Sequence, residues 1–363
     1  MHAVVPDAVN LASVKRILVV KLRHHGDVLL TSPVFSVLRN RAPHVEIDAL
    51  VYRETADMLA GHPAIARIHT VDRAWKRQGF MKQMRHESGL MRTLGERRYQ
   101  LLVHLTDHWR GAWIANLLKP RWSVAPAKGS SRLWKWSFTH RYPLPRATPR
   151  HAVELNLDAL RRVGIYPAES EKSLVLVPGG EAQSRVDALL AESGLGARGF
   201  IQLHPTSRWL FKSWTEEANA QLIQRLAADG HRLVVTGAPD TRERAILARI
   251  VEAAGVPVTD FSGKLTLREM GALASRARLF IGVDSAPAHI ASAMGTPVVV
   301  LFGPSGDREW GPWHVEHRVI ASERHPCRPC GNDGCGGGKV SECLTTLPVE
   351  RVHAAVNELL AAR

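Results

Sequence analysis

The sequence has no hydrophobic run long enough to cross a membrane. Its longest apolar stretches have the length of a strand, such as Thr296 to Phe302, whereas a membrane helix needs roughly 20 apolar residues. The first residues also lack the basic and then apolar order of a secretion signal. We therefore expect a cytoplasmic protein.

Several nucleotide-binding patterns are absent as well. The chain contains neither a Walker loop nor a GxGxxG fingerprint, and the dipeptide Gly263-Lys264 has no P-loop around it. ATP hydrolysis and nicotinamide chemistry therefore have no motif support, which makes an oxidoreductase improbable. No Asp-x-Asp pair stands at a strand end, which argues against a sugar nucleotide bridged by a metal.

Acidic residues are scarce in the first half only. Residues 1–165 hold 27 Lys and Arg against 12 Asp and Glu, whereas the remainder holds 21 against 22. The net charge of +14 therefore belongs to the first half. A one-sided basic field attracts a polyanion, which could be a phospholipid surface, a phosphorylated glycolipid or nucleic acid. Solvated basic faces without a partner are the alternative.

Cysteine is rare and confined to one place. The four cysteines, Cys327, Cys330, Cys335 and Cys343, all lie in the last 40 residues, within or at the end of a Cys-rich segment at 323–343. In a cytoplasmic chain such clustering is more typical of a metal site than of disulfides, and four thiolates could complete a tetrahedral zinc site. Reduced thiols in a loop, or redox pairs formed after purification, are the alternatives.

The chain of 363 residues is long for one core, so two domains are expected. Apolar, β-branched runs alternate with helical stretches, which predicts α/β domains with parallel, doubly wound sheets. The predicted strands are Arg16–Leu22, Val45–Val51, Ala66–Val71, Gln100–Leu105, Phe200–His204, Arg232–Thr236, Phe280–Val283 and Pro297–Phe302, and the predicted helices are Asp27–Arg41, His151–Gly164 and Glu216–Asp229. The two halves share this layout.

These elements divide the chain into an N-terminal domain at 1–165, a loose connection at 166–196 and a C-terminal domain at 197–363. Residues 125–150 interrupt the pattern with Pro, Gly and Ser. Within them Arg132–Tyr142 interleaves basic and aromatic residues, which suits a membrane interface or a loop that faces a glycan. Tryptophans buried under a surface strand would produce the same pattern.

Open α/β sheets bind ligands beyond the carboxyl ends of their strands, and polar residues gather at three such places. The first follows Val283, where Asp284, Ser285 and His289 surround the start of a helix. Free N–H groups and the helix dipole favour an anion there, so a ligand that carries phosphate is expected. Alternatively, Asp284 is only an N-cap of the helix.

The second place follows the first strand. Arg23-His24-His25-Gly26-Asp27 is a basic turn, with a glycine that lets a substrate approach the backbone. Asp27 could act as the general base that deprotonates an attacking hydroxyl, or it could simply cap the next helix. The two histidines do not have the spacing of metal ligands.

The third place is His204-Pro-Thr-Ser-Arg-Trp-Leu-Phe-Lys-Ser-Trp214. The hydroxyls of Thr206 and Ser207 can donate hydrogen bonds, and Lys212 lies just before the next helix. Together they could bind a diphosphate and neutralise charge on a leaving phosphate.

Taken together, these motifs resemble glycosyltransferase family 9, the heptosyltransferases of lipopolysaccharide core synthesis. The resemblance covers nearly the whole chain and rests on Ile17–Pro33, Arg208–Trp214 and Gly282–His289, of which the last two are most like the heptosyltransferase III branch. It implies a GT-B fold, in which two Rossmann-like domains face each other across a cleft, with the acceptor on the first and the nucleotide sugar on the second.

The resemblance also implies an inverting reaction. Asp27 would deprotonate a hydroxyl of an inner-core heptose, which attacks the anomeric carbon of ADP-L-glycero-D-manno-heptose. The implied donor-binding residues are Thr206, Ser207, Lys212, Leu265, Asp284, Ser285, Ala286, Pro287 and His289, and the acceptor-binding residues are Arg23, His25 and Gly26. No cofactor is required for this reaction, and zinc would be structural.

The implied partners are the ADP-heptose donor, the lipopolysaccharide core acceptor and the anionic inner face of the inner membrane, where the enzyme would be peripheral. Nucleic acid is not an expected partner. Two other functions fit the residues. One is a related glycosyltransferase that uses a different nucleotide sugar, and the other is a basic protein that binds polyanions without turnover.

Overall fold

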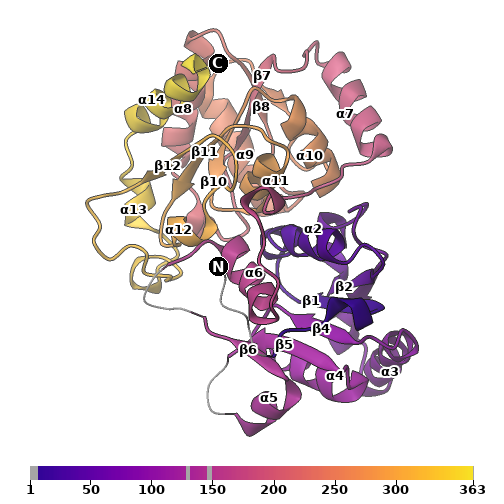
Figure 1. The fold of residues 1–363 in the computed structure, drawn as a ribbon. Helices are drawn as coiled ribbons and strands as arrows, with labels where there is room; N and C mark the ends of the chain where they lie inside the picture. The colour runs from indigo at the N-terminus through magenta and orange to yellow at the C-terminus, as the bar shows by residue number, and fades with distance from the viewer. Residues whose placement is uncertain (1–6, 128–130, 145–148, 363) are drawn as a thin grey trace. The chain divides into compact units, whose positions relative to one another are not determined.

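The computed structural model describes residues 7–127, 131–144 and 149–362. The chain forms two compact units, residues 1–175 and 176–363 (Figure 1). No helix among the described residues is both long and apolar enough to span a bilayer. The boundary between the units falls inside the predicted connection at 166–196.

Unit 1 contains a six-stranded parallel sheet with the strand order β3-β2-β1-β4-β5-β6. Its strands are β1 (Arg16–Lys21), β2 (Glu46–Tyr52), β3 (Arg67–Val71), β4 (Leu101–His104), β5 (Trp122–Pro126) and β6 (His140–Tyr142). Its α-helices are α1 (His25–Leu29), α2 (Ser32–Arg41), α3 (Phe80–Glu96), α4 (Arg110–Leu118), α5 (Arg132–Ser137) and α6 (Ala152–Arg162). Short 3₁₀ turns are η1 (Leu11–Ser13), η2 (Arg53–Met58), η3 (Arg73–Arg77) and η4 (Glu169–Glu171).

Unit 2 repeats this topology with the order β12-β11-β10-β7-β8-β9. Its strands are β7 (Phe200–His204), β8 (Arg232–Val235), β9 (Thr259–Asp260), β10 (Leu279–Val283), β11 (Val298–Phe302) and β12 (His317–Ala321). Its helices are α7 (Gly180–Glu192), α8 (Glu216–Ala228), α9 (Thr241–Ala254), α10 (Leu267–Arg276), α11 (Ala286–Ala293), α12 (Asp307–Trp310), α13 (Glu342–Thr345) and α14 (Val349–Ala361), with 3₁₀ turns η5 (Leu210–Lys212) and η6 (Cys335–Gly337).

In both units the strand order reverses direction beside the first strand, between β1 and β4 and between β7 and β10. The loops that leave two such neighbouring strands go to opposite faces of the sheet, so a crevice opens at their carboxyl ends. The predicted site residues follow β1, β7 and β10. The topology therefore assigns one crevice to each unit.

The inner strands of both sheets are buried on both faces, which explains why they are continuous apolar runs. Strand β10 is an example, because Leu279 and Ile281 join the apolar cluster that contains residues of α8, α9 and α14. Phe280 points the other way, into a cluster with residues of α10 and α11. This alternation places helices on both faces of the second sheet. The predicted doubly wound sheets are confirmed.

Three local predictions are wrong. The predicted helix at Asp27–Arg41 is two helices, because Leu30 ends α1 and Pro33 occupies the first turn of α2, where proline is favoured. The predicted loose connection contains the 13-residue helix α7. Residues 125–150 contain α5 and β6 where an interruption was expected, although 128–130 and 145–148 lie outside the described residues.

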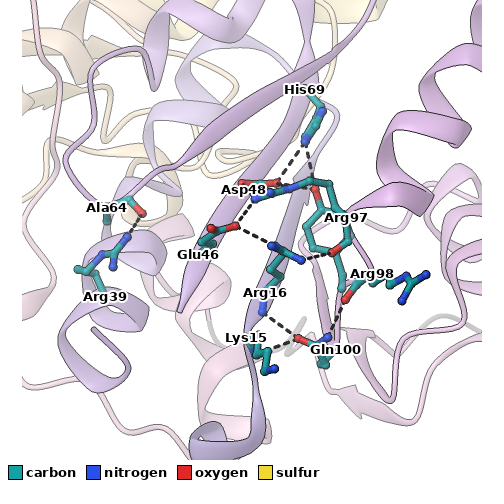
Figure 2. Close-up of polar contacts among 11 residues, drawn as sticks. Lys15, Arg16, Arg39, Glu46, Asp48, Ala64, His69, Arg97, Arg98 and Gln100 are labelled. Carbon is teal, nitrogen blue, oxygen red and sulfur yellow. Dashed lines mark hydrogen bonds and ion pairs between the residues drawn. The ribbon is translucent and has the colours of Figure 1, made fainter. Parts of the chain in front are cut away.

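A polar cluster ties the amino ends of the strands of unit 1 together (Figure 2). Asp48 of β2 is fully buried and accepts hydrogen bonds from Arg97 Nε at 2.8 Å and the Tyr99 hydroxyl at 2.6 Å. His69 Nε2 of β3 lies 3.3 Å from the same carboxylate. Burial alone would raise the pKa of Asp48, but these hydrogen bonds lower it to about 2. The cluster lies at the edge opposite the crevice, so its role is structural.

We expect Asp48→Asn to destabilise the protein by about 1.5–3 kcal/mol, because the largely buried Arg97 guanidinium would lose its buried charge partner and keep only Glu46, 2.6 Å away. Urea unfolding measures this difference, and the exposed Glu96→Gln is the control. The folded pKa of Asp48 lies below its unfolded value of 3.8, so its contribution is present above about pH 4 and is lost as the pH falls toward 2. The two proteins should therefore converge in stability below pH 4. A constant difference down to pH 2 would contradict this account.

Candidate active site

The crevice of unit 1 carries Asp27 in the first turn of α1. His24 is the N-cap residue of this helix, so the alternative in which Asp27 is the cap is wrong. The Asp27 side chain is half-buried, and among the described residues no hydrogen bond or ion pair engages its carboxylate. A carboxylate without a partner at the carboxyl edge of a parallel sheet can accept a proton from a ligand.

The predicted acceptor-binding residues, Arg23, His25 and Gly26, are neighbours of Asp27 in the sequence. In the structure they occupy the turn after β1 and the start of α1. The exposed Arg23 guanidinium lies 3.2 Å from the carboxylate of Asp107, which follows β4. The His25 ring is held 2.8 Å from the backbone oxygen of Glu54. The loops after β1 and β4 are therefore linked by an ion pair that the sequence did not reveal.

A buried hydrogen-bond network fixes the helix that carries Asp27. Lys21, at the end of β1, donates to the Leu105 backbone oxygen at 3.2 Å and to Asn156 Oδ1 of α6 at 3.0 Å. The Asn156 amide then donates to the backbone oxygen of Leu30, which ends α1, at 3.0 Å. Because all three connections are buried, α1 is held in one position relative to the sheet. Asn156 is a positioning residue that sequence reasoning missed.

The crevice of unit 2 is crossed by an ion pair between two of the predicted residues. Lys212 Nζ, at the end of η5, lies 2.6 Å from Asp284 Oδ2, which follows β10. Ser285 is the N-cap residue of α11, so the alternative in which Asp284 only caps that helix is wrong. The pair lies between η5 and the start of α11. It places a cation where an anionic ligand can reach it.

The hydroxyls of Thr206 and Ser207, which were predicted to bind phosphate, both form hydrogen bonds within the protein. Thr206 is buried and its hydroxyl donates to Glu243 Oε2 of α9 at 2.9 Å, so in this structure it is already committed. Ser207 is also buried, and its oxygen accepts from the Trp209 backbone N–H at 3.4 Å. Glu243 is a buried carboxylate that the sequence analysis did not single out. Glu243 is hard to recognise as a site residue from the sequence, because it is one of several charged residues in its helix.

The end of β7 contributes no charge. His204 is buried with Nδ1 3.1 Å from the Thr236 hydroxyl, and burial lowers its pKa to about 4. The imidazole is therefore neutral at physiological pH. The cations of this loop are the exposed Arg208 and Lys212, whose Nζ lies 5.4 Å from the centre of the Trp209 ring.

The remaining donor-side residues lie on two segments. Ala286 and Pro287 form the first turn of α11, and His289 is buried one turn further on. Leu265 is half-buried against the apolar cluster that contains residues of α7 and α10. The neighbouring Gly263 has a φ of +71° and donates to the Gly237 backbone oxygen at 2.9 Å, which ties the loops after β8 and β9 together.

The Cys-rich segment contacts η5 through Ser341, whose hydroxyl donates to the Phe211 backbone oxygen at 2.6 Å. Cys327, Cys330 and Cys335 are exposed, Cys343 is buried, and burial raises the pKa of the Cys343 thiol. In the part of the chain that the structure describes, no group of three or more His, Cys, Asp or Glu is arranged to hold a metal ion. Zinc binding by the four cysteines stays a prediction.

Three comparisons with known proteins agree with one another. The family model "Glycosyltransferase family 9 (heptosyltransferase)" matches residues 88–340. An Escherichia coli "Lipopolysaccharide heptosyltransferase 3" is 35% identical over 295 residues, which is 80% of this chain and 84% of that protein. The crystal structure of a family 9 glycosyl transferase from Veillonella parvula DSM 2008 superposes with a TM-score of 0.82 at 23% identity and covers 96% of this chain and 98% of that one.

A further solved structure, E. coli heptosyltransferase WaaC with ADP, has a TM-score of 0.72 at 19% identity and covers 95% of this chain and 99% of that chain. At this identity the likeness concerns the fold. The predicted GT-B type of fold, with two Rossmann-like units, is confirmed by these matches and by the two parallel sheets.

Proposed function

Because the chain belongs to glycosyltransferase family 9, the heptosyltransferases, we propose that it transfers heptose from ADP-L-glycero-D-manno-heptose to a heptose of the lipopolysaccharide inner core. The relative at 35% identity is named a lipopolysaccharide heptosyltransferase 3, and WaaC was solved with ADP. Both names support this donor and this class of acceptor. The enzyme is a glycosyltransferase.

The observation that carries the proposal is the half-buried carboxylate of Asp27, which has no partner among the described residues. In the proposed reaction Asp27 accepts the proton of an acceptor hydroxyl, whose oxygen attacks the anomeric carbon of the donor. The bond between this carbon and the phosphate oxygen breaks on the opposite side, and ADP leaves with the bonding electrons. The configuration at the anomeric carbon is thereby inverted.

The donor half of the reaction is assigned to unit 2. Negative charge grows on the diphosphate as the bond breaks, and Lys212 together with the N-terminus of α11 can stabilise it. Lys212 is paired with Asp284, which keeps its ammonium group in place. Thr206 and Ser207 shape the adjacent loop, and Glu243 orients Thr206.

We also propose that the protein works at the anionic inner face of the inner membrane, where a lipid-anchored acceptor would be presented. The support is the charge distribution, since residues 1–165 hold 27 Lys and Arg against 12 Asp and Glu. Basic residues near an anionic bilayer each contribute about 1 kcal/mol of attraction.

The direct test is to incubate the protein with ADP-heptose and a deacylated, heptose-terminated core oligosaccharide, and to measure ADP release and product mass. We expect one added heptose per acceptor, and selective thermal stabilisation by ADP over UDP, GDP, CMP and NAD. Stabilisation by another nucleotide, with transfer from its sugar, would replace the donor. Binding to any polyanion without turnover would instead support a non-catalytic binding protein.

A further inference from the structure

Exposed large apolar side chains are concentrated on one part of unit 1. Of the eleven such residues in the described chain, eight lie on α3, α4 and α5 or directly before α4. We call these eight the tryptophan face; they are Phe80, Met81, Met84, Trp109, Trp113, Leu117, Leu133 and Trp136. Exposed large apolar side chains that gather on one part of a protein are typical of a docking site.

The three helices that carry the tryptophan face pack in sequence, α3 against α4 and α4 against α5. Arg110 of α4 binds both carboxylate oxygens of Glu87 of α3 at 2.7 and 2.8 Å. Asn116 of α4 donates to the Ser137 hydroxyl of α5 at 2.6 Å. These contacts hold α4 between α3 and α5 in unit 1 (Figure 1).

Spacing along α4 and α5 determines which side chains are exposed. Trp109, Trp113 and Leu117 recur every four residues and occupy one side of α4, and the two indole rings meet edge to face with centroids 5.9 Å apart. In α5, Trp134 is buried whereas Trp136 is 81% exposed. Within this one segment, one tryptophan therefore belongs to the core and the other to the surface.

The surroundings of these apolar residues are basic. Between residues 109 and 137 the sequence has six Lys and Arg and no Asp or Glu. Lys119, Arg121, Arg132 and Lys135 are exposed, and Glu87 is neutralised by Arg110. A protein partner would need a large acidic surface with an apolar centre, whereas an anionic bilayer offers acidic headgroups above acyl chains everywhere.

We propose that the tryptophan face docks on the surface of an anionic phospholipid bilayer, with the indole rings at the headgroup boundary and the basic side chains on the phosphates. Trp109 follows Asp107 by two residues, and Asp107 holds Arg23 of the acceptor segment. The docked face therefore adjoins the loop of the acceptor crevice within the same unit. This last point rests on the proposed function, because it assumes that the acceptor is a lipid-anchored sugar.

The test is co-sedimentation of the full chain with vesicles of phosphatidylcholine, with and without phosphatidylglycerol, at increasing salt concentration. We expect binding to the anionic vesicles that weakens with salt, and a loss of about tenfold or more in the partition coefficient for Trp113→Gln/Trp136→Gln. The matched control is Val340→Gln, which removes an exposed apolar side chain of unit 2. Unchanged vesicle binding by the double variant, or no binding by the wild type, would overturn the proposal.

A second readout separates this proposal from the proposed function. The double variant should keep the thermal midpoint and its transfer rate to the deacylated acceptor, and lose rate only with acceptor embedded in vesicles. If the wild type transfers heptose to neither acceptor but still binds vesicles, the proposed function is wrong and the proposed docking surface is retained. Self-association through this face without vesicle binding would assign it to a second copy of the chain and overturn the membrane assignment.

Discussion

Asp27→Asn is expected to lower kcat for heptose transfer by about 10²–10⁴-fold while the dissociation constant of ADP stays unchanged. The amide preserves the size of the side chain but cannot accept the proton of the acceptor hydroxyl. ADP binds to unit 2 in our assignment, so its affinity reports on a site that the substitution does not touch. Single-turnover transfer assays and calorimetric titration with ADP measure the two quantities.

The control for this substitution is Asp57→Asn, which changes an exposed carboxylate of η2 in the same unit. Asp57→Asn should leave kcat equal to the wild-type value within error. This result would show that the loss of one negative charge from unit 1 does not by itself lower kcat. If Asp27→Asn transfers heptose at the wild-type rate, Asp27 is not the base. A loss of ADP affinity or of thermal stability alongside kcat would indicate a structural role instead.

Lys212→Ala is expected to raise the dissociation constant of ADP about 10- to 100-fold and to lower kcat about 10²–10³-fold. Two effects contribute to the loss. The diphosphate loses a charged hydrogen-bond donor, and the carboxylate of Asp284, 2.6 Å from Lys212 in the free protein, is left without its partner beside the anionic ligand. Calorimetric titration with ADP measures the first quantity, and a transfer assay measures the second.

The second effect has its own test. Adding Asp284→Asn to Lys212→Ala should restore part of the ADP affinity, because the repulsive carboxylate is then absent. Arg318→Ala is the control, since it removes a cation that forms an exposed ion pair, with Glu358 of α14 at 2.9 Å, elsewhere in unit 2. ADP affinity that is the same in wild type and Lys212→Ala would exclude Lys212 from the phosphate site.

Local signals in the sequence located most strands and the turns that carry the candidate site. Strand β7 begins and ends at Phe200 and His204 as predicted, because a buried parallel strand is a short apolar run bounded by polar residues. Helix boundaries were harder to predict. Helix α7 was overlooked because Gly179, Gly180 and the neighbouring Pro178 suggested a loop, although glycine can also begin a helix.

Resemblance to a family extended these local signals to a donor and an acceptor. It identified Asp27, Lys212 and Asp284 by their places in motifs, but it could not say what each side chain contacts. The tryptophans of α5 are another example of side chains whose contacts could not be predicted. The pattern Trp134-Lys-Trp136 fits both a buried and an exposed role, and only the packing of α5 against α4 separated the two.

The fold class, the repeated layout of the two units, the concentration of basic charge in the first half and the polar residues at the strand ends could all be predicted without the structure. These properties depend on composition and on periodicity within a few neighbouring residues. Tertiary structure alone decided which distant residues meet: Arg23 with Asp107 across 84 positions, Thr206 with Glu243 across 37, and Lys21 with Asn156 across 135. Such pairs depend on strand order and helix packing, which bring distant loops to one edge of a sheet, and no local pattern records that arrangement.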